Sequence, residues 1–271
     1  MNFLKRNLAP ITDEAWEEID NEAMRVLKGN LSGRKVSDVC GPEGMKLSAV
    51  GLGRVKPGKS SPVEGVEWGV REVQPLTEIR VPFSLDIWEL DNMARGCADP
   101  DLDAVDDAAR KVAIFEETAV YQGFDKGCIS GILSSSPHKE VSLPQKDAGA
   151  MPTAVEAAIV AIEKASIGGP YALVLGSTAY EMMMAGDRQG YPVNKRVEGL
   201  VNGGIHWSPA LSCGVLISMR GGDFELTLGQ DLSIGYHNST TKRVDLYLTE
   251  SFTFRVLEPA AAVGLKWEGS G

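Results

Sequence analysis

The chain has 271 residues, which is long enough to form one large domain or two smaller ones. Its formal net charge of −10 disfavours nonspecific binding to nucleic acid or to an anionic membrane. No segment approaches the ~18 uninterrupted apolar residues of a membrane-spanning helix, and Asp13 and Glu14 interrupt the N-terminal stretch where a signal peptide needs its apolar core. We therefore expect a cytoplasmic protein that binds neither membrane nor nucleic acid.

The N-terminal part of the sequence predicts a helix followed by an extended arm. Thr12 is a suitable N-cap for a helix over residues 12–31, because apolar residues repeat there at helical spacing. Residues 38–75 place many Gly and Pro residues between short mixed runs, and residues 66–73 are the most strand-like of these runs. This composition is typical of an extended hairpin-like arm. The apolar residues of the helix are Trp16, Ile19, Ala23, Val26 and Leu27.

The middle of the sequence predicts helices that alternate with strands. A long amphipathic helix is predicted from Leu102 to Gln122, with Asp101 and Asp103 at the N-terminus, where the helix dipole favours negative charge. The alternation that follows indicates an α+β protein with a compact insert. Its predicted elements are a helix over 153–166, a buried strand over 171–175, a Met-rich helix capped by Ser177 and ended by Gly186, a helix starting at Pro192, and a strand over 214–219.

The C-terminal part contains a long alternating segment at residues 244–257. Apolar side chains occupy one face, except at Glu250, and polar side chains occupy the other. The segment predicts a half-buried strand about twice as long as usual. Such a strand needs a long partner, or a neighbouring chain, to pair its backbone groups. The apolar face consists of Val244, Leu246, Leu248, Phe252, Phe254 and Val256.

Residues 53–60 match the phosphate-loop pattern G-x-x-x-x-G-K-[ST]. A phosphate site also requires a buried strand before the loop and a helix directly after it. Pro62 and Gly65 break any helix that would follow Ser60. We therefore interpret the match as an exposed basic loop that fits the pattern by chance.

Other residue types that carry chemistry are scattered. His138, His206 and His237 lie far apart, and none has the spacing of a metal ligand on a helix. Glu116 and Glu117 are adjacent on the long helix and therefore point in different directions, so we expect them on a solvated or inter-subunit face. The four cysteines show no metal-ligand spacing and are expected to be reduced thiols. A catalytic site assembled from distant residues would leave no sequence motif, and no residue of the sequence points to such a site.

Four blocks of this sequence resemble the encapsulin shell proteins of family 1, the linocin/bacteriocin-like group, which have the tailed-phage (HK97-like) major capsid fold. The blocks lie at residues 1–20, 81–96, 220–236 and 249–259, in the same order as in the family. The resemblance implies an α+β capsid fold with an extended loop. It places the N-terminal, cargo-facing arm and helix at 1–37, the extended loop at 38–75, the peripheral domain at 76–152 and 221–271, and the axial domain at 153–220.

The resemblance also implies a function. It predicts a shell subunit that self-assembles, as about 60 copies or a larger icosahedral multiple, into a nanocompartment with pores for small solutes. The enclosed cargo would be a peroxidase or a ferritin-like enzyme, held through a C-terminal targeting peptide, which connects the particle to oxidative stress and iron storage. The shell itself would not be an enzyme and would require no cofactor. The alternatives are a phage-type major capsid protein and, less favoured by the residues, a hydrolase or nucleotide-binding enzyme.

The same resemblance implies three sets of site residues. A cargo peptide would dock between the first helix and the last long strand, on Met24, Leu27, Leu31, Leu246 and Leu248. The five-fold pore would be lined by the loop Asp187, Arg188, Gln189 and Gly190. A planar ligand such as flavin could stack on an exposed Trp88 near Arg80 and Tyr191.

Overall fold

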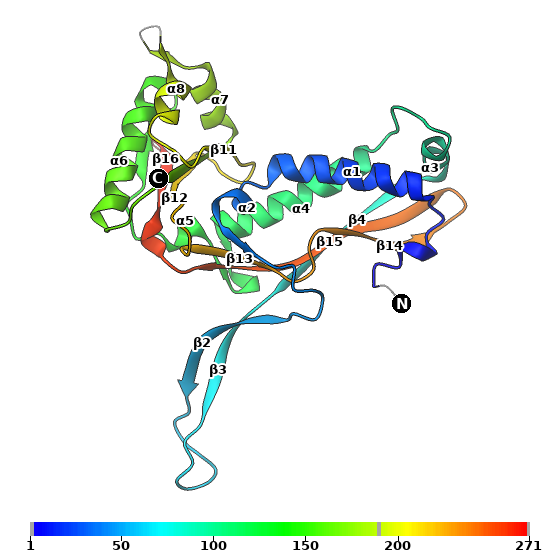
Figure 1. The fold of residues 1–271 in the computed structure, drawn as a ribbon, viewed down its shortest axis with the longest axis horizontal. Coiled ribbons are helices and arrows are strands. Elements are labelled where there is room, and N and C mark those ends of the chain that lie inside the picture. Colours follow the sequence, from blue (N-terminus) through cyan, green and yellow to red (C-terminus); the bar gives the residue numbers. More distant parts are fainter. Residues whose placement is uncertain (1–2, 189–190, 270–271) are drawn as a thin grey trace.

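Two mixed bodies of helices and strands and one projecting hairpin make up the molecule (Figure 1). The computed structural model describes residues 3–188 and 191–269. Within these ranges no helix combines the length and the apolar character needed to cross a bilayer. The mixture of helices and strands confirms the predicted α+β class.

A single long strand, β15 (Arg243–Val256), organises the five-stranded sheet of the larger body. One of its edges pairs antiparallel with β4 (Thr77–Asp86) along ten registered residues. Its other edge is shared by β14 (Ser233–Ser239) and β13 (Phe224–Leu228), and β1 (Asp38–Cys40) adds to β13 in parallel. The predicted long strand is confirmed, and its backbone partners come from the same chain.

The polar face of β15 is more buried than the alternation predicts. All residues from Leu246 to Phe254 are buried, including those expected to face solvent. The short polar side chains on this face are hydrogen bonded close to the sheet: Thr249 donates to the Ile79 carbonyl at 2.8 Å, and Thr253 accepts from Gln74 at 3.0 Å. Small, satisfied polar side chains can be covered by their neighbours in a central strand without a desolvation penalty.

Helices α1 (Asp13–Asn30) and α4 (Asp103–Tyr121) cover the apolar face of this sheet (Figure 1). The Thr12 hydroxyl accepts a hydrogen bond from the Ala15 amide at 3.3 Å, so the predicted N-cap is confirmed. The predicted apolar stripe of α1 packs against α4, and Ile19 is completely buried there. The core between the two helices and the sheet fixes α1 in place.

The smaller body is built around a second five-stranded sheet, in the order β11-β8-β12-β16-β7. Strand β8 (Tyr171–Leu175), which lies between β11 and β12, is buried along its whole length and coincides with the predicted buried strand. Gly176, not Ser177, occupies the N-cap position of the next helix, because Ser177 is already its first helical residue. The other elements are β11 (Ile205–Trp207), β12 (Gly214–Ser218), β16 (Ala262–Trp267), β7 (Val141–Leu143), α6 (Met151–Lys164), α7 (Ser177–Ala185) and α8 (Val193–Glu198).

This second sheet draws on more of the chain than the range 153–220 predicted for the axial domain. Strand β16 pairs antiparallel with β12, and β7 pairs in parallel with β16. Both strands lie in ranges that the sequence assigned to the peripheral domain. The C-terminal segment thus leaves the larger body after β15 and completes the smaller one, because the apolar residues Val263 and Leu265 fit its core.

The hairpin of β2 (Ala49–Pro57) and β3 (Gly69–Pro75) projects away from both bodies (Figure 1). The phosphate-loop pattern runs through β2 and into the tip of this hairpin, and no helix follows Ser60. The expectation that residues 53–60 are mostly exposed and are not followed by a helix is confirmed, but residues 53–57 belong to strand β2 and only residues 58–60 lie in the loop. The remaining short elements are η1 (Arg6–Leu8), α2 (Gly33–Val36), α3 (Ile87–Ala94), β5 (Gly123–Phe124), η2 (Asp125–Gly127), β6 (Ile129–Ser130), α5 (Ile132–Ser135), η3 (Ala148–Ala150), β9 (Asp187–Arg188), β10 (Tyr191–Pro192) and η4 (Pro259–Ala261).

Candidate functional site

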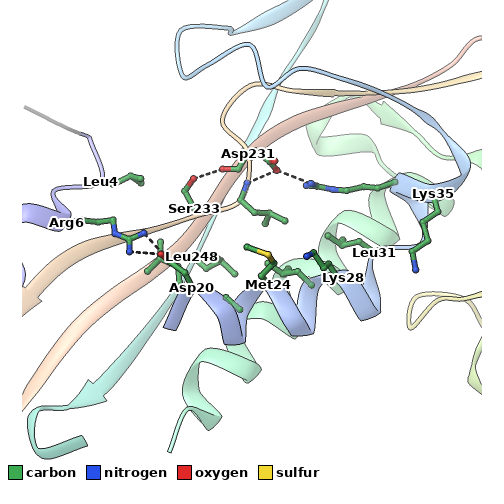
Figure 2. Close-up of a pocket in the computed structure, with 15 residues that line it drawn as sticks. Leu4, Arg6, Asp20, Met24, Lys28, Leu31, Lys35, Asp231, Ser233 and Leu248 are labelled. Atoms are coloured by element: carbon green, nitrogen blue, oxygen red, sulfur yellow. Dashed lines mark hydrogen bonds and ion pairs between the residues drawn. The ribbon is translucent and has the colours of Figure 1, made fainter. Parts of the chain in front are cut away.

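A groove of about 630 Å³ runs along α1, between this helix and the segment that leads into β14 (Figure 2). Its floor is apolar, and charged side chains stand around its rim. The floor residues are Met24, Leu27, Leu31, Leu232, Ile234 and Leu248, and the rim includes Arg6, Asp20, Lys28, Lys35 and Asp231. An apolar floor with a polar rim can hold an extended peptide by its aliphatic side chains while the peptide backbone stays near water.

The helix side of the groove follows from residue spacing. Met24, Leu27 and Leu31 lie three and four positions apart and therefore share one face of α1. Leu27 and Leu31 are 7% and 6% exposed and belong to the core, whereas Met24 is 47% exposed. An exposed methionine adapts its unbranched side chain to different partners. Met24 is thus the most accessible apolar contact that α1 offers in the groove.

The N-terminal segment closes one end of the groove. Both guanidinium nitrogens of Arg6 donate to the Asp20 carboxylate, at 3.1 and 2.7 Å, and the guanidinium lies 3.9 Å from the ring centre of Trp16. The Leu4 carbonyl accepts a hydrogen bond from the Tyr236 amide at 2.8 Å. These contacts hold the segment against both α1 and β14, so this end of the groove is formed without a ligand.

The opposite end of the groove rests on a buried ion-pair cluster. Arg34 donates to Asp231 on the rim at 2.9 Å, and beneath the groove it donates to Glu116 at 2.6 Å and to Glu250 at 3.0 Å. Glu116 and Glu250 are both completely buried. Burial raises the pKa of Glu250 well above its ordinary value, and the charge of Glu116 raises it further.

The expectation that Glu116 and Glu117 lie on a solvated or inter-subunit face was wrong. Both side chains are completely buried, because α4 carries them into the space between the two bodies. Glu117 accepts hydrogen bonds from Ser32, from the Gly33 amide and from Ser208, at 2.5, 2.6 and 2.6 Å. Burial raises the pKa of Glu117 to about 7. This carboxyl joins the N-terminal arm, the long helix and the smaller body at one point.

The groove contains most of the predicted cargo-docking residues. Met24, Leu27, Leu31 and Leu248 line it together, whereas Leu246 lies in the core below and does not reach it. Sequence reasoning missed Leu232 and Ile234, which come from β14 and the turn before it. The available signal was the apolar pair itself, in a segment that precedes the long strand and pairs with its edge. Their role in docking stays a prediction for all of them.

The predicted pore residues lie between α7 and α8. Backbone pairing places Asp187 opposite Pro192 and Arg188 opposite Tyr191, in a two-stranded turn of β9 and β10. Gln189 and Gly190 lie outside the described residues. The strands of this turn lie beyond α7 and α8, at the top of the smaller body in Figure 1. The assignment as a pore loop stays a prediction.

One chain does not bring the predicted planar-ligand residues together. Trp88 is the second residue of α3, and its side chain is 74% exposed. The Arg80 guanidinium instead lies 5.0 Å from the ring centres of both Phe3 and Tyr247. Tyr191 belongs to the smaller body, whose α8 lies at the end of the molecule opposite to α3 (Figure 1). A flavin site from these three residues would therefore require more than one chain.

The other chemical candidates form no catalytic arrangement in the part of the chain that the structure describes. His138 has one ring nitrogen 2.9 Å from the Ala260 carbonyl, and burial lowers the pKa of His206. Among the described residues, no group of three or more His, Cys, Asp or Glu side chains is placed to hold a metal ion.

Comparisons with known proteins agree with this geometry. The family described as an encapsulating protein for peroxidase matches residues 1–253. A type 1 encapsulin shell protein of Rhodospirillum rubrum is 45% identical, over 98% of this chain and 97% of the relative. Among solved structures, the virus-like particle of Pyrococcus furiosus aligns with a TM-score of 0.67 at 17% identity, covering 93% of this chain and 100% of that one. The structure from Mycobacterium phage Bobi aligns with a TM-score of 0.61 at 13% identity, covering 89% and 91%. The chain therefore belongs to the type 1 encapsulin shell proteins and has the HK97-like fold of phage capsid subunits.

Proposed function

We propose that this protein is the shell subunit of an encapsulin nanocompartment: about 60 copies, or a larger icosahedral multiple, close around a cargo enzyme. The observation that carries the proposal is the β2–β3 hairpin, which is fully formed and yet has apolar side chains exposed on both strands. In this proposal the particle lies in the cytoplasm, and the subunit binds neither nucleic acid nor membrane.

The hairpin requires a partner for physical reasons. A two-stranded hairpin on its own is marginally stable in water. Here Val55, Val70 and Val73 are 57%, 59% and 55% exposed, and Trp68 near the tip is 48% exposed. Complete burial of a valine contributes about 1.5–3 kcal/mol, so covering one of these partly exposed valines contributes roughly half of that. Repeated around a closed particle, such contacts sum to a stable assembly.

The groove along α1 is the proposed docking site for the C-terminal peptide of the cargo. Its volume and apolar floor suit a short extended segment with Leu or Ile anchors. The description of the family as encapsulating a peroxidase supports a peroxidase as cargo, and a ferritin-like enzyme is the other class that we consider. Chemistry would then belong to the cargo, and the shell would act without a catalytic residue or a required cofactor.

The first test is the native mass of the purified protein, by light scattering after size exclusion with negative-stain images of the peak. Closed hollow particles of about 1.7 MDa are expected for sixty subunits of 29.1 kDa. A larger discrete mass would keep the shell and change its geometry. A monomer or dimer at physiological salt would overturn the proposal.

The second test concerns docking. The probe is a dye-labelled Gly/Ser peptide with leucines at alternate positions, compared with the same peptide carrying aspartates there. We expect Met24→Asp to weaken binding of the leucine peptide roughly tenfold, a loss of about 1.4 kcal/mol. The matched control is Val160→Asp on α6, since Val160 is similarly exposed, at 45% against 47%. Both variants are first checked for assembly, and equal affinities in the two would remove the groove from the proposal.

A further inference from the structure

A buried cluster of carboxyl groups lies beneath the end of the groove at Arg34, where α2, α4 and β15 meet. We call this the inner end of the groove. The Arg34 guanidinium from α2 enters it with only 19% of its side chain exposed. It contacts Glu116 on α4 and Glu250 on β15, both completely buried, and Asp231 at the rim. Three carboxyl groups therefore surround one guanidinium, and two of them have no access to water.

One buried carboxyl oxygen of this cluster lacks a hydrogen-bond donor among the described residues. Oε2 of Glu250 accepts from Arg34, but among the described residues no donor reaches its Oε1. A single proton removes the deficit, because a protonated Glu250 can donate to the neighbouring Glu116 carboxylate. The same proton lowers the number of buried charges to one carboxylate and one guanidinium, which is the arrangement that a low-dielectric interior tolerates.

A fourth carboxyl, that of Glu117, lies next to the cluster on α4 and contacts the same segment of chain, residues 32–33. It accepts from the Gly33 amide and the Ser32 hydroxyl, and the Ser32 hydroxyl lies 2.7 Å from the Tyr121 hydroxyl. The ionisable groups that face this junction are thus Arg34 from α2, Glu116, Glu117 and Tyr121 from α4, Glu250 from β15, and Asp231 from the turn before β14. From the smaller body, the neutral Ser208 donates to Glu117. His206 of β11 also lies near α2: burial lowers the pKa of His206, and the positive charge of Lys35 on α2 lowers it further.

We propose that the buried carboxyls of Glu117 and Glu250 form a proton-held latch, which fastens α2 and the inner end of the groove to the shell and releases them when the protons are lost. The inference deepens the docking function proposed above and rests on it where the groove is concerned, because Arg34 and Asp231 are groove residues. The latch itself is a property of the folded subunit.

The direction of the effect follows from the pKa shifts. Both Glu117 and Glu250 have a pKa raised above the ordinary 4.5. Each therefore contributes stability that is fully present below about pH 4.5 and is lost as the pH rises through the raised pKa. That loss is centred at about 7 for Glu117, and the raised pKa of Glu250 adds a loss in the same direction. Release of α2 is thus an alkaline event, and the latch is closed in mildly acidic solution.

The test is amide hydrogen exchange of α2 in assembled shells between about pH 6 and pH 9, corrected for the intrinsic pH dependence of exchange. In the wild type, the opening equilibrium of α2 is expected to rise by up to about tenfold per pH unit for each linked proton. Glu250→Gln removes one titrating group and reduces the slope. The double variant Glu117→Gln with Glu250→Gln keeps α2 protected throughout, and the exposed Glu18→Gln on α1 behaves as the wild type.

A wild-type α2 whose protection does not change with pH would overturn the proposal, as would a Glu250→Gln slope equal to that of the wild type. If the variants fail to assemble, infrared difference spectra of wild-type shells decide: the carbonyl stretch of a protonated carboxylic acid must be present at neutral pH and must disappear on alkaline titration. Neither measurement contains cargo. Opening of α2 without binding of the leucine peptide at any pH would therefore uphold the latch and reject the docking function.

Discussion

Strand β15 and the β2–β3 hairpin are both long antiparallel structures, yet they are completed in different ways. Both edges of β15 are paired within the chain, and its residues from Leu246 to Phe254 are buried. The hairpin has only one ladder, between its own two strands, and almost every residue in it is exposed. The first region is complete in the isolated subunit, and the second has apolar surface that the subunit does not cover.

This difference separates what folding stabilises from what assembly stabilises. Burial of Phe252 and Phe254 against α4 and the smaller body is settled when the chain folds. Burial of the hairpin valines requires another subunit, which fits membership of a shell-forming family. Mutations in the two regions should therefore fail in two distinguishable ways, one in the stability of the subunit and the other in the size of the particle.

The largest effect is expected from charges on the hairpin. Val55→Asp with Val70→Asp places a charge on each strand at exposed positions, so the subunit should still fold. Assembly should be abolished, because a carboxylate buried in an apolar contact costs several kcal/mol and the cost repeats at every copy. Light scattering would then give a mass more than about tenfold below that of the shell. Val55→Thr with Val70→Thr is the milder control, and full-sized particles from the aspartate variant would contradict the comparison.

Phe254→Ala should have the second largest effect, and it changes β15, the region that is completed within the chain. The side chain is completely buried, and its loss leaves a cavity at the junction of β15 with the smaller body. The free energy of unfolding should fall by about 3–5 kcal/mol. Urea unfolding of subunits that carry the hairpin aspartates measures this without the contribution of the shell. A loss below about 1 kcal/mol, as for a surface position, would mean that β15 is not the core strand described above.

The sequence was sufficient wherever a local pattern decides the structure. The cap and stripe of α1, the enclosed strand β8 and the length of β15 follow from spacing and alternation, which are properties of consecutive residues. No helix begins directly after Ser60, because Pro62 and Gly65 prevent one. Met24, Leu27 and Leu31, which line the groove on α1, were also named, but from the resemblance to encapsulin shell proteins and not from residue spacing.

Pairings between distant residues were not predictable from these patterns. Glu116 and Glu117 looked solvated because adjacent glutamates on a helix usually are, and their partners Arg34, Ser32 and Ser208 lie more than eighty residues away in the sequence. The same limit applies to residues 141–143 and 262–267, which fall in the ranges given to the peripheral domain, whereas β7 and β16 pair within the second sheet. When the partner of a residue lies far away in the sequence, the neighbouring residues show no pattern that would reveal the pairing.

Glu117→Gln tests how this buried carboxyl affects the stability of the folded subunit, which is the side of the comparison that is completed within one chain. Raising the pKa from 4.5 to about 7 corresponds to about 3 kcal/mol of stability that the wild type loses between these pH values. A glutamine keeps an acceptor for the Gly33 amide and a donor for Ser208, so the variant should unfold with a flatter pH dependence. The measurement is the free energy of unfolding at a series of pH values, with the exposed Glu18→Gln as control. Parallel curves for wild type and Glu117→Gln would refute the assignment.

The smallest effect is expected at the N-terminal end of the groove, which lies between the two extremes of the comparison. Arg6 holds its segment to α1 through Asp20 and Trp16, but the Asp20 side chain is 40% exposed and solvent screens the pair. Arg6→Ala should therefore lower the free energy of unfolding by about 1 kcal/mol or less. Its local effect should be larger: faster amide exchange at Leu8 and Ala9, whose amides close the turn over residues 5–9, and weaker binding of the leucine peptide. The control is Arg110→Ala, which removes an exposed ion pair of α4 away from the groove. If Arg6→Ala and Arg110→Ala bind the peptide equally, the N-terminal segment does not help to form the groove. It then resembles the exposed hairpin, whose surface the subunit leaves uncovered, and not the buried strand β15.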